Sequence, residues 1–123
     1  MILIDTNILI EIYRNNTTIV DAVKKIGQDN IAVSDITCAE LYYGARNKKE
    51  LQTIAKDLKK LDILAIQTEI SSKAVALVEK YALSHKLDIP NALIASTAIY
   101  HNLPLYTLNM KDFVFIEGIK LYK

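Results

Sequence analysis

The sequence predicts an α/β fold with a mostly parallel central sheet of about five strands and helices on both faces. Short apolar runs that favour β-strands alternate along the chain with longer segments of helical periodicity. Runs such as Ile2-Leu3-Ile4 are apolar without alternation, which is typical of strands that helices cover on both sides. The pattern therefore indicates a three-layer arrangement.

Each element follows from its local pattern. The apolar β-like runs are Met1 to Ile4, Ile31 to Val33, Ile63 to Ile66, Leu105 to Leu108 and Val114 to Ile116. The helical segments are Ile8 to Arg14, Thr18 to Ile26, Thr37 to Arg46, Lys49 to Leu61, Glu69 to His85 and Asn91 to Tyr100. No repeat or linker interrupts this alternation, so we expect one domain over residues 1–123.

Composition sets limits on the class of protein. With 123 residues, 51% of them hydrophobic, one core can form without disulfides or a structural metal. The single cysteine, Cys38, lies in an apolar helical stretch and is expected to be a buried hydrophobe in a cytoplasmic protein. The start of the chain resembles neither a signal peptide nor a membrane span. A net charge of +1 excludes a strongly basic protein that coats nucleic acid.

Two acidic residues follow predicted strands, where parallel sheets bind their ligands. Asp5 comes directly after the first strand, and it could either cap the next helix or bind a ligand. Glu40 follows the second strand, but Thr37-x-x-Glu40 also matches a capping box, in which the glutamate would serve the helix. Metal binding would instead require the Glu40 carboxylate to turn toward Asp5.

Two further segments place polar side chains in similar positions. Pro90 marks the start of a helix that Asp88 could cap, so Asn91 lies in the first helical turn. Asn109 and Asp112 follow the fourth predicted strand, where an ordinary loop is the plain alternative. Carboxylates gathered in this way repel one another by about 4 kcal/mol at ~4 Å and an effective dielectric of 20, so they need a cation. Hard oxygen ligands select Mg²⁺, with Mn²⁺ as a substitute.

Four ordered blocks of sequence resemble the PIN-domain proteins, and among them the VapC-like ribonuclease toxins. The blocks are Met1 to Asn7, Ser34 to Leu41 with Tyr43-Gly44-Ala45, Ile89 to Ala98, and Leu103 to Asn109 with Lys111-Asp112-Phe113. Four blocks in this order are far more specific than any one of them.

The resemblance implies a site and an activity. Asp5, Glu40 and the position of Asn91 would hold the catalytic cation, with Asn109 or Asp112 as a fourth polar contribution. It implies an Mg²⁺-dependent endoribonuclease toxin that cleaves structured RNA, either tRNA or rRNA. It also implies a cognate antitoxin protein as partner, and a homodimer.

Position 91 departs from the family pattern, which has Pro-Asp-Ala-Leu-Ile-Ala where this chain has Pro90-Asn91-Ala92-Leu93-Ile94-Ala95. Asparagine keeps the shape of aspartate and one oxygen but loses the charge, so it should weaken metal binding. We interpret Asn91 as an inactivating change in a protein that would otherwise be toxic. A natural variant with lowered or redirected activity is the alternative.

Two other functions are alternatives to the ribonuclease interpretation. A catalytically silent PIN-fold module could act through antitoxin or RNA binding, and restored cleavage in Asn91→Asp would argue against it. A phosphorylated response-regulator domain would need paired acids near the N-terminus, which the single Asp5 does not provide.

Local surfaces would have to hold RNA and antitoxin. The cations nearest in sequence to the acidic sites are Arg14, Arg46, Lys48, Lys49, Lys86 and Lys111. An apolar groove for an antitoxin helix has as its candidates Ile8, Ile12, Ile19 and Val23, which could equally be plain core.

Overall fold

The computed structural model describes residues 1–123 and has a four-stranded parallel sheet in the order β3-β2-β1-β4. The strands are β1 (Ile2–Ile4), β2 (Ile31–Ser34), β3 (Asp62–Leu64) and β4 (Leu105–Tyr106). The predicted α/β class with a parallel sheet is confirmed.

All six predicted helices form, with boundaries that differ from the prediction by at most three residues. They are α1 (Thr6–Tyr13), α2 (Thr17–Ile26), α3 (Asp35–Tyr43), α4 (Lys48–Leu58), α5 (Thr68–His85) and α6 (Ile89–Tyr100). No helix is both long and apolar enough to cross a membrane.

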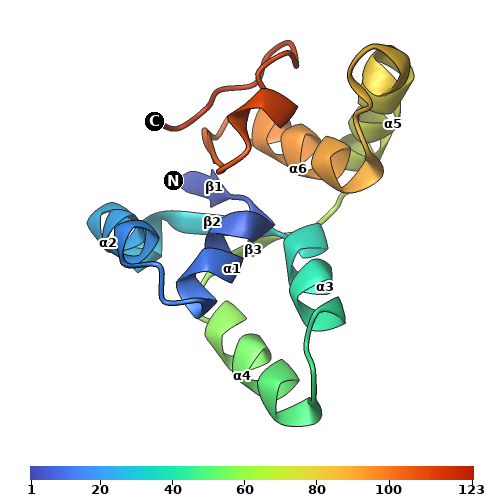
Figure 1. The fold of residues 1–123 in the computed structure, drawn as a ribbon. Helices are drawn as coiled ribbons and strands as arrows, with labels where there is room; N and C mark the ends of the chain where they lie inside the picture. Colours follow the sequence, from blue (N-terminus) through green and yellow to red (C-terminus); the bar gives the residue numbers. More distant parts are fainter.

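The helices cover both faces of the sheet, and each face has its own core. Leu3 and Ala32 pack against α5, α6 and the C-terminal segment, whereas Ile4 and Val33 pack against α1 to α4. This division follows from the strand period of two, which sends neighbouring side chains to opposite faces. Figure 1 shows the same layers, with α5 and α6 above the sheet, α1 and α4 below it and α2 to the left.

The prediction of a fifth strand at Val114 to Ile116 was wrong. Phe113 and Ile116 are buried, whereas Val114 is 65% exposed, so burial follows a spacing of three rather than two. The backbone turns here, because the Ile116 N–H donates to the Phe113 carbonyl. The chain returns to the sheet edge further on, where Leu121 forms an isolated parallel bridge with Leu105.

The strand order creates a switch point between β1 and β4. The chain passes from β1 to β2 and β3 on one side of the sheet and then crosses to β4 on the other side of β1. In open parallel sheets the crevice beyond the carboxyl ends of two such strands is where ligands bind. The residues that follow β1 and β4 are Asp5 and Thr107.

Candidate active site

Asp5 is fixed at the switch point by both of its carboxylate oxygens. Its Oδ1 accepts a 2.7 Å hydrogen bond from the Thr6 N–H, and its Oδ2 accepts a 2.8 Å bond from the Thr107 hydroxyl. Its own N–H donates to the Tyr106 carbonyl, which aligns the ends of β1 and β4. Asp5 therefore acts as the N-cap of α1 and also stands in the crevice, so the two interpretations of this residue are compatible.

The environment of Asp5 opposes a negative charge there. Burial is the main cause that raises the pKa of Asp5, and the charges of Glu40 and Asp112 raise it further. The bonds from Thr107 and Thr6 oppose this rise without cancelling it. Three carboxylates from separate segments are thus close enough to interact electrostatically, and a bound cation would relieve their repulsion.

Glu40 does not form the capping box that the sequence offered as an alternative to metal binding. The N-cap of α3 is Ser34, whose side chain accepts from the Ile36 N–H, and Thr37 lies buried inside the helix. The Glu40 carboxylate instead accepts a 2.7 Å hydrogen bond from the Thr6 hydroxyl, which also lies 3.0 Å from the Thr37 hydroxyl. Glu40 is therefore tied to the residue directly after Asp5.

Asn91 lies where the sequence places it, in the first turn of α6. Asp88 is the N-cap of this helix and accepts a 2.8 Å bond from the Asn91 N–H, and Pro90 occupies the first turn. Asn91 is half-buried, and its side-chain amide makes no hydrogen bond within the protein. Helix α6 packs against α3, the helix that carries Glu40.

The last two candidates lie in the short segment after β4. The exposed Asn109 contributes its N–H to the Thr107 hydroxyl at 3.1 Å, and no bond of its side-chain amide is present. Asp112 ends the 3₁₀ helix η2 (Met110–Asp112), is half-buried, and adds its charge to the field at Asp5. Asp112, rather than Asn109, is therefore the residue of this segment whose charge acts on Asp5.

The donors at this crevice suit a hard divalent cation in type. They are carboxylate oxygens, and Mg²⁺ prefers oxygen ligands and retains several waters. No hydrogen bond links Asn91 to these carboxylates, since its N–H bonds only Asp88. The chain contains no group of three or more His, Cys, Asp or Glu side chains close enough to share one metal ion. A cation here would therefore take the remaining ligands from water and from neutral oxygens.

The contacts of two hydroxyl residues at the site were not predicted from the sequence. Thr107 holds Asp5, and the Asn7 side chain donates to the same hydroxyl at 3.4 Å. Thr37 contacts Thr6, which holds Glu40. The place of Thr107 directly after β4 was a signal that could have found it, whereas the local sequence marked Thr37 only as a capping residue and gave no sign of its contact with Thr6.

A separate apolar groove of about 300 Å³ lies between α1, α2 and α4. Ile12 and Val23 line it, as the sequence suggested. Ile8 and Ile19 do not, because both are buried in the core under these helices. Cys38 is in the same core, and burial raises the pKa of its thiol, which fits a structural role.

Comparisons with known proteins agree on one family. Residues 2–114 match the family described as PIN domain. Ribonuclease VapC1 of Methanocaldococcus jannaschii is 30% identical over 126 residues, covering 98% of this chain and 86% of the relative. Ribonuclease VapC10 of Mycobacterium tuberculosis is 30% identical over 122 residues, covering 98% and 91%.

Solved structures show the same arrangement of elements. A toxin–antitoxin complex from Klebsiella pneumoniae contains a chain that superposes with a TM-score of 0.82 and 34% identity, covering 97% of this chain and 95% of that one. VapBC2 from Rickettsia felis, bound to a DNA fragment from its promoter, gives a TM-score of 0.81 with 28% identity, covering 99% and 98%.

Proposed function

This chain belongs to the PIN-domain family, among its VapC-like ribonucleases, and from that premise we propose that it is an Mg²⁺-dependent endoribonuclease whose activity Asn91 attenuates. We further propose that it is the toxin of a toxin–antitoxin pair and acts on structured RNA, either tRNA or rRNA. The observation that carries the proposal is the buried Asp5 carboxylate, which Thr6 and Thr107 hold at the sheet's switch point while the Thr6 hydroxyl bonds the Glu40 carboxylate.

The proposed chemistry divides the work among the residues described above. Mg²⁺, when bound, would activate water for in-line attack on a phosphodiester and stabilise the leaving oxygen. Asp5 would be the firmest ligand, since hydrogen bonds to both oxygens hold its carboxylate in place. Glu40, oriented by the Thr6 hydroxyl, would orient the attacking water or help to hold a cation. Asp112 would act through bound water.

Asn91 would supply a neutral oxygen where the family pattern has a carboxylate. Its position in the first turn of α6 places it at the positive end of a helix dipole, where a carboxylate is favoured and an amide gains less. The substitution removes one negative charge from the ligand set, so cation binding and cleavage should both weaken. The fold should persist, because the cap of α6 comes from Asp88 rather than Asn91.

Cleavage of a total tRNA and rRNA pool tests the activity. The chain as it stands, Asn91→Asp, and Asn91→Asp with Asp5→Asn would be compared in Mg²⁺ and in EDTA. We expect Asn91→Asp to cut fastest, EDTA to stop it, and the added Asp5→Asn change to abolish it. Metal-independent cleavage would contradict the scheme, and no cleavage by any form would favour a silent binding module.

The apolar groove between α1, α2 and α4 is proposed to receive a helix of the antitoxin. Its apolar lining includes Leu9, Ile12 and Val23, which suits the apolar face of an amphipathic helix. Co-purification of the tagged chain with the antitoxin that is co-expressed beside it tests this. Val23→Asp should abolish co-purification, whereas Val75→Asp, on the exposed surface of α5, should not.

A further inference from the structure

A second and larger groove leads away from Glu40. It has a volume of about 750 Å³ and lies between the C-terminal ends of α1 and α3 and the N-terminal half of α4. Only four of its twelve lining residues are hydrophobic, which distinguishes it from the apolar groove. Because Glu40 forms part of its wall, a molecule seated in this groove would extend directly from the candidate active site.

Three cations line this groove. Arg14 comes from the end of α1, Arg46 precedes α4, and Lys49 lies in its first turn. The other cations named from the sequence, Lys48, Lys86 and Lys111, are exposed elsewhere and do not line it. Against the two carboxylates in the lining, Glu40 and Glu50, the three cations give the groove a small excess of positive charge.

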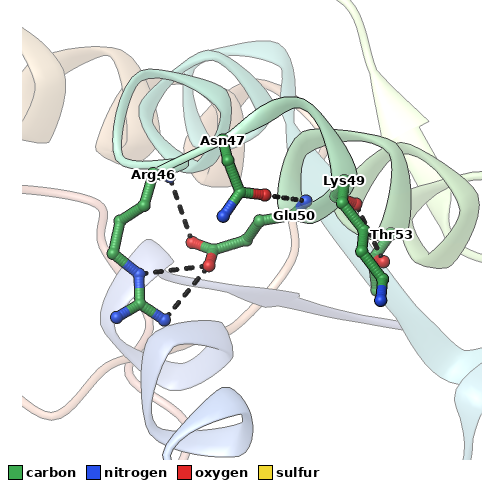
Figure 2. A network of polar contacts seen from close by, with 5 residues as sticks. All are labelled: Arg46, Asn47, Lys49, Glu50 and Thr53. Carbon is green, nitrogen blue, oxygen red and sulfur yellow. Dashed lines mark hydrogen bonds and ion pairs between the residues drawn. The ribbon is translucent and has the colours of Figure 1, made fainter.

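The Arg46 side chain is held in place. Its Nε and Nη2 atoms each lie 3.2 Å from Glu50 Oε2, and the Arg46 N–H donates to Glu50 Oε1 at 3.4 Å. Asn47 caps α4 by accepting a 2.8 Å bond from the Glu50 N–H, as Figure 2 shows. Glu50 uses the same side of the guanidinium throughout, which leaves the remaining N–H donors of Arg46 for a ligand.

The ion pairs of this groove are weak competitors for a phosphate. The Arg46 side chain is 85% exposed and Arg14, paired with Glu11 at 3.2 Å, is 73% exposed. Exposed pairs of this kind contribute about 0–1 kcal/mol. Lys49 has no acidic partner within salt-bridge distance. A phosphate could therefore recruit all three cations at little cost.

Tyr13 adds an aromatic surface to the same groove. It lines both the cationic and the apolar groove and is 42% exposed. Its hydroxyl donates a 2.8 Å hydrogen bond to Asp57 of α4, which fixes the ring between the two helices. Aromatic rings interleaved with cations are the typical composition of surfaces that bind single-stranded nucleic acid.

We propose that this groove binds the substrate RNA as an unpaired segment, with Arg46, Lys49 and Arg14 on its phosphates and Tyr13 stacked on a base. The inference rests on the proposed ribonuclease function, since it supplies the substrate surface beside that site. Phosphate contacts fix the register of the strand without reading its sequence. The phosphodiester next to the bound segment would then lie toward Glu40.

Binding of a short fluorescein-labelled single-stranded RNA, followed by fluorescence anisotropy in EDTA, tests the proposal without any cleavage. Arg46→Gln with Lys49→Gln should weaken binding about tenfold and lower the salt slope by about 1.4, because each lost phosphate contact contributes about 0.7. The matched control is Lys56→Gln with Lys59→Gln. It removes the same charge at exposed positions of the same helix and its cap, outside the groove.

Stacking is tested with a second pair of variants. Tyr13→Phe keeps the ring and should bind RNA as the unaltered chain does, whereas Tyr13→Leu should weaken binding about fivefold or more. Equal losses in groove and control variants, or no loss in either, would overturn the proposal. The proposal would also be overturned if the groove variants bound RNA normally but no longer bound the antitoxin, because the groove would then be a site for the protein partner. A failure of Asn91→Asp to cleave would refute the nuclease proposal alone.

Discussion

The Thr107 hydroxyl donates a 2.8 Å hydrogen bond to Asp5 Oδ2 across the junction of β1 and β4. Both residues are buried, and each directly follows the last residue of its strand. The bond joins segments 102 positions apart in the chain, so the central acid of the crevice depends on the closing strand. The same hydroxyl accepts from the Asn109 N–H, which couples the loop carrying Asp112 to Asp5.

Thr107→Val should therefore destabilise the protein by about 1–3 kcal/mol, because it leaves a buried carboxylate oxygen without its donor. It should also raise the pKa of Asp5 further, since the Thr107 bond lowers it. Urea unfolding at neutral pH measures the loss. Thr107→Ser retains the hydroxyl and is the matched control; equal stability of the valine and serine variants would show that the bond contributes nothing.

Thr6→Val should reduce cleavage by the Asn91→Asp protein about tenfold to a hundredfold. The substitution removes the hydroxyl that orients the Glu40 carboxylate, and groups that orient metal-site residues have effects of this size. Thr6→Ser should restore most of the rate. If both variants cleave RNA at the parent rate while remaining folded, Glu40 does not need to be oriented by residue 6.

Tyr13→Phe should alter stability in a pH-dependent way. Burial, followed by the hydrogen bond to Asp57 and the charge of Asp57, raises the pKa of Tyr13 from its ordinary value of 10.0. A raised pKa favours the neutral phenol in the folded state. Its contribution to stability is therefore complete below pH 10.0 and is lost as the pH rises toward the folded-state pKa.

The unaltered chain should accordingly be about 1 kcal/mol more stable than Tyr13→Phe at neutral pH, with the difference shrinking above pH 10.0. Urea unfolding across this range measures it. Tyr43→Phe is the control, because Tyr43 is 94% exposed and its substitution should have no effect at neutral pH. If the difference in unfolding free energy between the unaltered chain and Tyr13→Phe increased at alkaline pH, the raised pKa of Tyr13 could not be its cause.

Phe113→Ala should cost about 3–5 kcal/mol, because the ring is fully buried in the core against α5 and α6. Val114→Ala should cost less than about 0.5 kcal/mol, since that side chain lies 65% exposed. Thermal unfolding distinguishes the turn found here from the strand expected from sequence. A β-strand with Val114 and Ile116 facing inward would reverse the order of the two losses.

Much of the fold could be predicted from sequence, because the signals were periodic and local. The helix that Asp88 caps and Pro90 begins is one example, and the unbroken apolar runs of β1 and β2 are another. The segment after Lys111 was misread because Phe113 to Ile116 is a short apolar run, which does not distinguish a strand from a turn. Tertiary burial of Phe113 and Ile116 decided the conformation.

The site was predictable only in part. Asp5, Glu40 and Asp112 were predicted from their places after strands, and the charges of Glu40 and Asp112 contribute to the raised pKa of Asp5. The contacts of the Thr107 and Thr37 hydroxyls could not be predicted, since their partners lie 102 and 31 positions away in the chain. The capping-box interpretation of Glu40 was wrong because α3 begins earlier, with Ser34 as its N-cap. The Glu40 carboxylate instead accepts a hydrogen bond from Thr6, which is distant in the sequence.

Mn²⁺ binding followed by electron paramagnetic resonance tests most directly whether position 91 completes a divalent-cation site with Asp5. We predict that Asn91→Asp binds Mn²⁺ at least about tenfold more tightly than the unaltered chain, because it restores a full charge to the ligand set. Adding Asp5→Asn should remove the gain. Equal Mn²⁺ affinities of the unaltered chain and Asn91→Asp would show that position 91 is not part of the cation site.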